Sequence, residues 1–258
     1  YDEIGLRRCV DAAVANIGYG RALADNEAIG VAVGWWPSFS VPSGAYVKLD
    51  GDGSGQIITG AQECGTGAVM TLRQLAAEEL GMRAEDFELV YQDTSVAPYD
   101  MGATGSQTVF NNGRAVVLAA QQIAEQLKQL AAEQLEAAAA DIVLADGVAH
   151  VAGSPATTVS IVELAGIAGG GELLIGHGSG APPAAPPLRG SSCVGDIGMA
   201  AFVAPQFSCH AVRVALDRDT GGARVLEASF AHNSGTIIND LGARAQREGG
   251  VLMGIGRV

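Results

Sequence analysis

Three segments of the chain combine glycine with small polar residues at places where a helix is expected to begin. They cover residues 62–67, 102–108 and 232–250. Glycine lets the backbone come close to a ligand, and the unpaired N–H groups of a helix start suit an oxyanion or a phosphate. Each segment alone also fits an ordinary capping loop with a solvated surface. Together they are the candidate ligand-binding segments of the chain.

The cysteines and histidines of the sequence do not form a recognisable metal or catalytic site. The four cysteines lie far apart in the chain, and no Cys/His cluster has the spacing of zinc ligands. Cys209 and His210 are neighbours in an expected strand, where successive side chains point to opposite faces, so a dyad between them is not expected. We expect reduced thiols, and therefore a cytoplasmic location, for Cys9, Cys64, Cys193 and Cys209.

The composition predicts a globular protein without nucleic-acid or membrane partners. The chain has 258 residues, of which 48% are hydrophobic and 17% charged, and its formal net charge is −13. Nucleic acids and anionic membrane surfaces attract a basic field, which this charge does not supply. No apolar run approaches the ~18 residues of a membrane-spanning helix. The 36 glycines indicate tight turns, close backbone packing or contact with a ligand, although a high-GC genome would also raise their number.

Helical and strand patterns are mixed along the chain without a strict βαβ order. This mixture predicts an α+β fold, with mixed sheets and helices packed on them. The first candidate segment then lies between a strand and a helix, the second precedes a long helix, and the third leads into a closing helix. The expected helices cover 6–23, 66–80, 114–138, 160–165 and 241–255, and the expected strands and hairpins cover 30–36, 45–49, 56–61, 87–91, 142–151, 208–216 and 223–231.

A stretch rich in glycine and proline, residues 169–192, indicates how the chain divides. We interpret it as a linker or as an ordered wrapping loop between a first α+β part, residues 1–168, and a second part, residues 193–258. The closing helix of the second part contains three glycines between residues 249 and 254. Glycine costs about 1 kcal/mol in a helix, so these residues predict tight packing against another element or a cofactor.

Four motifs, in this order, resemble those of a known family. They begin at Gly65, Asp93, Gly102 and His232. The sequence with these motifs resembles the molybdopterin-binding region of the large subunit of the molybdenum hydroxylases, the xanthine dehydrogenase and aldehyde oxidase family. The motifs are a GTG turn before a helix ending in AEELG, a DT…PYD turn, a GATGSQT loop before an NGRAV helix start, and a closing HNSGTIIN…AQREGGVLMGIG stretch.

The resemblance implies a molybdenum–pyranopterin cofactor, as molybdopterin or as its cytosine dinucleotide form. It also implies oxidative hydroxylation of a small-molecule substrate, an aldehyde or an N-heterocycle, with water as the oxygen source. Electrons would leave through iron–sulfur and flavin subunits or domains. The first two segments would hold the phosphates and the pterin, and the glutamine of the closing helix would bond near the molybdenum ligands or the pterin. The implied cofactor-binding residues are Gly65, Thr66, Gly67, Gly105, Ser106, Gln107, Thr108 and Gln246.

The two ends of the sequence lead us to expect a fragment. The chain opens on Tyr1 and stops inside an apolar pattern at Val258, and the glutamate base of the family would follow that point. We therefore expect the isolated chain to be inactive without the remaining part of the large subunit, and its exposed interface to cause homo-oligomers or poor solubility. The alternative is a non-catalytic binding or assembly module with an empty cofactor site. Thr66, where the family commonly has glutamine, favours this alternative.

Overall fold

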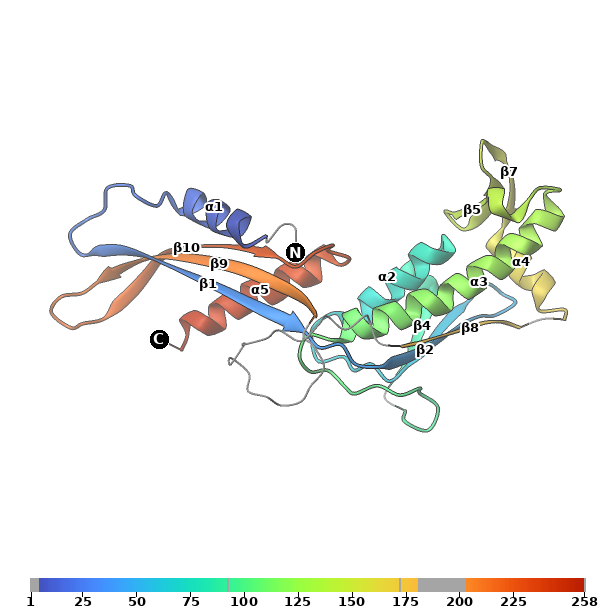
Figure 1. Cartoon of the computed structure of the whole chain (residues 1–258), viewed down its shortest axis with the longest axis horizontal. Coiled ribbons are helices and arrows are strands. Elements are labelled where there is room, and N and C mark those ends of the chain that lie inside the picture. The colour runs from blue at the N-terminus through green and yellow to red at the C-terminus, as the bar shows by residue number, and fades with distance from the viewer. Residues whose placement is uncertain (1–4, 92, 172, 181–202, 258) are drawn as a thin grey trace. The chain divides into compact units, whose positions relative to one another are not determined.

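The computed structural model describes residues 5–91, 93–171, 173–180 and 203–257, which form two compact units (Figure 1). One unit combines residues 5–38 with 203–236, and the other combines the described residues of 39–201 with 237–257. Each unit is thus built from two distant stretches of the chain. This division differs from the expected boundaries at 168 and 193, because a strand near the start of the chain pairs with one near its end.

The first unit is a three-stranded antiparallel sheet, ordered β1-β9-β10, with helix α1 packed on it (Figure 1). The helix turns Cys9, Ala13 and Ile17, which recur every four residues, toward Cys209 and Ala211 of the central strand. All five residues are buried and form the small core of this unit. Its elements are α1 (Leu6–Ile17), β1 (Glu27–Ser38), β9 (Val203–Leu216) and β10 (Ala223–Asn233).

The second unit contains a four-stranded mixed sheet, ordered β4-β3-β2-β8, with helices α2 and α3 against it (Figure 1). Strand β4 runs parallel to β3 because helix α2 forms the connection between them, whereas the other pairs are antiparallel. A small antiparallel sheet, β5-β6-β7, belongs to the same unit. The strands are β2 (Ser43–Leu49), β3 (Gly55–Thr59), β4 (Phe87–Val90), β5 (Ile142–Ala145), β6 (Val148–Val151), β7 (Ser154–Ser160) and β8 (Leu174–Gly180). The helices are α2 (Ala68–Leu80), α3 (Gly113–Gln134), α4 (Ile161–Ala168) and α5 (Asp240–Ile255), with the short helical turns η1 (Ala84–Asp86), η2 (Thr108–Asn112) and η3 (Ala139–Asp141).

Helix α3 approaches strand β8 so closely that their main chains touch. The strand carries Gly176 and Gly178, and a Cβ at either position would overlap a carbonyl oxygen of the helix. Between these glycines, the Gln122 side chain bonds both main-chain groups of His177, its Nε2 donating to the carbonyl at 2.7 Å and its Oε1 accepting the N–H at 3.1 Å. These groups lie on an edge strand, so the amide of Gln122 takes the place of a neighbouring strand.

Two helices end earlier than their sequence patterns predict. Helix α1 ends at Ile17, not near residue 23, because Gly18 takes a left-handed conformation with a φ of +66° and caps it. Helix α3 ends at Gln134, not at residue 138, and Glu136 takes a left-handed φ of +49° just beyond that end. The segment 169–192, expected as a linker or wrapping loop, contributes strand β8 to the sheet, and its part after residue 180 lies outside the described residues.

The α+β class is confirmed, since helices pack on mixed sheets in an order without strict βαβ alternation. The prediction for Cys209 and His210 is also confirmed. Cys209 lies in the core of the first unit, while the ring of His210 stacks on Phe230 with centroids 6.1 Å apart. None of the helices in the described part of the chain has the length and apolar character needed to cross a membrane.

Candidate functional site

The loop between β3 and α2 carries the first candidate segment. Gly65 and Gly67 adopt left-handed conformations with φ of +89° and +79°, whereas Thr66 between them does not. Such alternation turns successive N–H groups toward one point and forms a nest, a concavity that binds anions. Helix α2 begins directly after Gly67, so this nest coincides with the positive end of a helix.

The carboxylate of Glu63 fills the nest. Its Oε1 accepts the N–H groups of Gly65, Thr66 and Gly67 at 2.6, 2.7 and 3.2 Å, and its Oε2 accepts that of Val69 at 3.1 Å. Burial raises the pKa of the Glu63 carboxyl, but the four N–H donors outweigh burial and hold this pKa below its usual value. The N–H groups expected to bind a phosphate are therefore bonded within the chain.

Sequence reasoning did not single out Glu63 as a functional residue. The available signal was an acidic residue two positions before a Gly-x-Gly turn that starts a helix. That signal is weak, because an acidic residue near a helix start is common and is usually solvated. Only the backbone conformation of the turn shows that four N–H groups converge on this one side chain.

Helix α5 brings the third candidate segment against the first. The side chain of Gln246 donates from Nε2 to the carbonyl oxygen of Gly65 at 3.0 Å, although the two residues are 181 positions apart. Asn239 caps the start of α5, because its Oδ1 accepts the N–H of Gly242 at 2.9 Å. Two of the expected cofactor-binding residues, Gly65 and Gln246, are thus in direct contact.

Of the two alternatives expected for the glycines near the end of α5, packing against another element is not found among the described residues, and packing against a cofactor stays a prediction. A Cβ at Gly249, Gly250 or Gly254 would meet no neighbouring atom of the described residues within 4 Å. Leu252 and Met253 of the same helix are 68% and 71% exposed. The tight packing expected from these glycines therefore has no partner in the described part of this chain.

The second candidate segment forms a loop that is held by hydrogen bonds of its buried side chain, Gln107. Gln107 is buried, and its Nε2 donates to the Gly102 carbonyl at 2.6 Å while its Oε1 accepts from Asn111 Nδ2 at 3.1 Å. The Gln107 amide therefore shapes the loop. Ser106 is exposed with a left-handed φ of +57°, a strain of about 1–3 kcal/mol of the kind that functional loops carry. Within the described residues, no hydrogen bond engages the hydroxyl of Ser106 or of Thr108.

A buried polar network behind this loop was not foreseen from the sequence. Asp100 Oδ2 accepts from Asn112 Nδ2 at 2.6 Å and from Ser43 Oγ at 2.7 Å, and its Oδ1 accepts the N–H of Gly102 at 2.7 Å. Asn112 Oδ1 in turn accepts from the hydroxyl of Thr59, at the end of strand β3, at 2.6 Å. The network thus ties the strand that leads into the first segment to the loop of the second.

A pocket of about 340 Å³ borders both of these segments. Gln62 lines it from the first segment and Gly102 from the second, while Asp93 and Asp100 contribute carboxylates. Gln62 Nε2 also donates to the carbonyl of Gly60 at 3.2 Å, which turns its amide along the wall of the pocket. Among the described residues, no hydrogen bond joins positions 105–108 to positions 65–67, and none of these positions lines the pocket.

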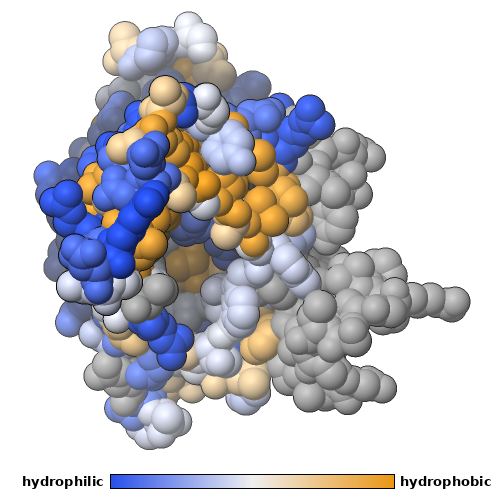
Figure 2. All heavy atoms as spheres, turned by 90° about the vertical axis from the view of Figure 1, so that its left-hand side faces the viewer, coloured by the Kyte–Doolittle hydropathy of each residue, from blue (hydrophilic) through white to orange (hydrophobic). Residues whose placement is uncertain are grey.

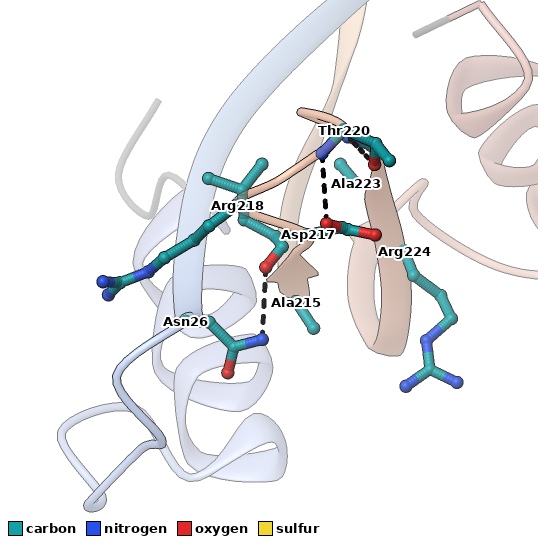
Figure 3. A pocket seen from close by; sticks show the side chains of 9 residues that line it. Asn26, Ala215, Asp217, Arg218, Thr220, Ala223 and Arg224 are labelled. Atoms are coloured by element: carbon teal, nitrogen blue, oxygen red, sulfur yellow. Dashed lines mark hydrogen bonds between the residues drawn. The ribbon is translucent and has the colours of Figure 1, made fainter.

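A second pocket, of about 670 Å³, lies in the first unit at the end of the β9–β10 hairpin (Figure 3). Asp217 Oδ1 accepts the N–H groups of Thr220 and Asp219 at 3.1 and 2.9 Å, as in an ordinary turn, and these two donors lower the pKa of the Asp217 carboxyl. Figure 3 shows Arg218 and Arg224 pointing away from each other, so their charges do not converge on one anion. The arrangement is that of a hairpin turn.

Hydrophobic residues are exposed on strand β1 of the first unit. Val31, Val33, Trp35 and Trp36 are 40%, 58%, 44% and 54% exposed. The first three share the face on which helix α1 lies, but this helix packs mainly on β9 and β10, whereas Trp36 lies on the opposite face of the sheet. Figure 2 shows hydrophobic residues gathered at the surface on one face of the molecule. Exposed apolar surface of this kind is typical of an interface with another protein or domain.

Comparisons with known sequences point to one family. The sequence profile of the molybdopterin cofactor-binding domain family matches residues 12–258. The large subunit of nicotine 6-hydroxylase from Paenarthrobacter nicotinovorans is 33% identical over 214 residues, which cover 82% of this chain and 25% of the relative. The xanthine dehydrogenase molybdenum-binding subunit of Escherichia coli O157:H7 is 29% identical over 224 residues, which cover 86% of this chain and 28% of the relative. The chain thus spans about a quarter of the length of these relatives.

Solved structures share the fold of this chain. Quinoline 2-oxidoreductase from Pseudomonas putida 86 is 27% identical, with a TM-score of 0.73 and coverage of 88% of this chain and 29% of that one. CO dehydrogenase from Oligotropha carboxidovorans is 21% identical, with a TM-score of 0.78 and coverage of 97% of this chain and 33% of that one. At this lower identity, the second likeness concerns the fold alone.

Proposed function

Because the chain belongs to the family of molybdopterin cofactor-binding domains, we propose that it forms part of the cofactor site in a molybdenum hydroxylase large subunit of the xanthine dehydrogenase and aldehyde oxidase type. The observation that best supports this is the hydrogen bond from Gln246 to Gly65. It joins the closing helix to the glycine turn, and both carry motifs that resemble the family. In this proposal, the remaining part of the large subunit completes the site.

The second segment fits the phosphate and pterin groups of such a cofactor. Ser106 and Thr108 offer hydroxyls that no described residue engages, at the start of the helical turn η2 that leads into helix α3. Gly105 lies between the loop and the ring of Phe39, and a Cβ at this position would overlap that ring, so the loop carries no side chain there. Hydroxyls and main-chain N–H groups at a helix start are the donors that phosphate oxygens require. We assign Gly105, Ser106 and Thr108 to direct contact with the cofactor, and Gln107 to support of the loop.

The first and third segments would contact the cofactor through side chains. Thr66 is exposed at the tip of its turn, between Gly65 and Gly67, and its hydroxyl is engaged by no described residue. Gln246 is exposed, and its Nε2 is oriented by the Gly65 carbonyl, which leaves its Oε1 as an acceptor. When bound, the molybdenum–pterin group, as molybdopterin or its cytosine dinucleotide, supplies the redox centre of the enzyme.

We further propose that the intact enzyme hydroxylates an aldehyde or an N-heterocycle with water as the oxygen source. The names nicotine 6-hydroxylase and quinoline 2-oxidoreductase among the similar proteins favour a heterocyclic substrate. Electrons would pass to iron–sulfur and flavin subunits or domains. Among the described residues there is no glutamate that we assign as the base, and the chain spans about a quarter of the length of its relatives, so we expect no turnover without the remaining part of the large subunit. The described cysteines are free thiols, which supports a cytoplasmic location.

Two features of the first segment favour the alternative, a non-catalytic binding or assembly module with an empty cofactor site. The nest in the first segment is filled by Glu63, and Thr66 offers only a short side chain there. A domain of this kind would keep the fold of the family and use its exposed surface for assembly. The exposed apolar side chains of strand β1 would serve either function.

The molybdenum and pterin content of the purified protein tests the proposal. We expect near-stoichiometric molybdenum by elemental analysis, and oxidised pterin by fluorescence, when the chain is produced with the remaining part of its large subunit. Ser106→Ala and Gln246→Ala should each lower the bound pterin severalfold, whereas Gln129→Ala, on an exposed position of helix α3, should not. Wild-type complex with neither molybdenum nor pterin would overturn the enzyme proposal and support the assembly module.

A further inference from the structure

We propose that Glu63 is a positioning residue whose carboxylate closes the nest ahead of helix α2 to phosphate and other external anions. The turn then contacts its ligand through the Thr66 side chain, and the loop of residues 102–108 binds the phosphates of a cofactor. The exclusion of anions follows from contacts within this chain. Its meaning for a pterin ligand rests on the proposed function.

The donors of the nest are already used. A main-chain N–H makes one hydrogen bond in ordinary geometry, and those of Gly65, Thr66, Gly67 and Val69 all end on the two oxygens of Glu63. The first two N–H groups lie 2.6 and 2.7 Å from Oε1, and bonds to a charged acceptor are shorter and stronger than those between neutral groups. An external phosphate would have to displace a carboxylate that the chain itself holds beside these donors.

Glu63 also brings a negative charge to the positive end of helix α2. The N–H donors lower the pKa of its carboxyl and favour its ionised form, so the carboxylate is charged at neutral pH. This charge compensates the helix dipole that would otherwise attract a phosphate, and it repels a second anion at the same place. Hydrogen bonding and charge therefore act in the same direction.

The same bonds orient the contact to helix α5. Gly65 donates its N–H to Glu63 at 2.6 Å and accepts Gln246 Nε2 on its carbonyl oxygen at 3.0 Å. The Gly65 carbonyl shares a planar peptide group with the N–H of Thr66, which donates to Glu63 Oε1 at 2.7 Å, so the carboxylate of Glu63 fixes the direction in which this carbonyl points. Glu63 thereby positions Thr66 and Gln246, two proposed ligand contacts, without touching the ligand.

A phosphate titration of the 258-residue chain, followed by amide NMR, tests the proposal directly. Inorganic phosphate is added, with sodium chloride of equal ionic strength as the control. We expect the N–H signals of Gly65, Thr66, Gly67 and Val69 to show no saturable shift specific to phosphate. A saturable shift of these signals in the wild-type chain would overturn the proposal, whether or not the protein binds a pterin.

Variants at the same position give a second measurement. Glu63→Ala should make hydrogen exchange at the four N–H groups at least about tenfold faster, and acetate should then shift their signals and restore protection. Glu63→Asp keeps the charge and should retain part of the protection. Glu78→Gln, which removes an exposed carboxylate of the same helix, should change none of these signals. Unchanged exchange in Glu63→Ala would contradict the proposal, and if that variant does not fold, the wild-type titration still decides.

Discussion

Replacing Thr59 by valine tests whether the buried network holds the two loops of the proposed cofactor site. Valine has nearly the same shape as threonine, so the change removes a hydroxyl while strand β3 keeps its packing. That hydroxyl donates to Asn112 Oδ1 at 2.6 Å and accepts the N–H of Ala61 at 3.2 Å. Thr59, Asn112 and Ala61 are all buried, so water cannot replace the lost bonds.

The expected cost follows from the two groups left without partners. A buried donor or acceptor that loses its only partner costs about 1–3 kcal/mol. Burial of the methyl group that replaces the hydroxyl contributes about 0.8 kcal/mol in the other direction, so the free energy of unfolding of the second unit should fall by about 1–5 kcal/mol. With a urea m value of about 2 kcal/mol/M, the unfolding midpoint should move down by about 0.6–2.6 M.

Two probes separate the two units in this experiment. Four of the five described α-helices, α2 to α5, belong to the second unit, so far-UV circular dichroism follows mainly its unfolding, whereas both tryptophans, Trp35 and Trp36, lie in the first unit. Thr158→Val, on an exposed position of strand β7, is the matched control and should stay within about 0.5 kcal/mol of the wild type. A dichroism midpoint for Thr59→Val equal to that of the wild type would refute the reasoning.

Three other contacts give testable outcomes. Gly178→Ala should destabilise the second unit by about 1–3 kcal/mol, because the new Cβ would overlap a main-chain carbonyl of α3. Gly171→Ala, where a Cβ would point into open space, should not destabilise it. Equal melting temperatures of these two variants by circular dichroism would contradict this prediction. The pKa of Glu63 is lowered in the folded chain, so the stabilisation that its carboxylate gives is complete above the unfolded pKa of about 4.3 and is lost as the pH falls through the lower folded pKa. In a pH titration by NMR, the amide signals of the nest should therefore change only below about pH 4. A transition of these signals near pH 6 would be inconsistent with a lowered pKa. Arg213→Met should lower the free energy of unfolding of the first unit by about 1 kcal/mol, since the guanidinium contacts Glu27 at 2.9 Å and Glu227 at 3.4 Å on the two neighbouring strands. Urea unfolding followed by tryptophan fluorescence measures this difference from the wild type, which should become smaller at high salt because salt screens the ion pairs.

Local patterns in the sequence were enough to identify the class of fold and most elements. The apolar period over 66–80 predicts helix α2, and Gly81, with a left-handed φ of +62°, caps the end of this helix. The hairpin of β2 and β3 was also predicted, because its alternating residues and glycine turn are neighbours in the chain. Where such a local signal was absent, as at Glu136 beyond helix α3, the predicted helix end was wrong by four residues.

The order of four motifs predicted the family, and the match of the family profile to residues 12–258 confirms it. Motifs could do this because they preserve residue types at fixed spacing. They also led to the eight expected cofactor-binding residues, whose role at a cofactor stays a prediction. The motifs did not show that Gln107 turns inward to hold its own loop, since its buried position depends on Asn111 and Gly102.

Only the tertiary structure decided which distant groups meet. Strand β1 pairs with β9, so the units do not follow the glycine- and proline-rich stretch, and Gln246 reaches Gly65 across 181 positions. Glu63 lies next to its turn in sequence, yet its role depends on φ angles that no residue pattern states. A motif records the type and spacing of side chains, whereas a hydrogen bond needs its two partners at one place and in one direction. The folded backbone alone supplies that placement.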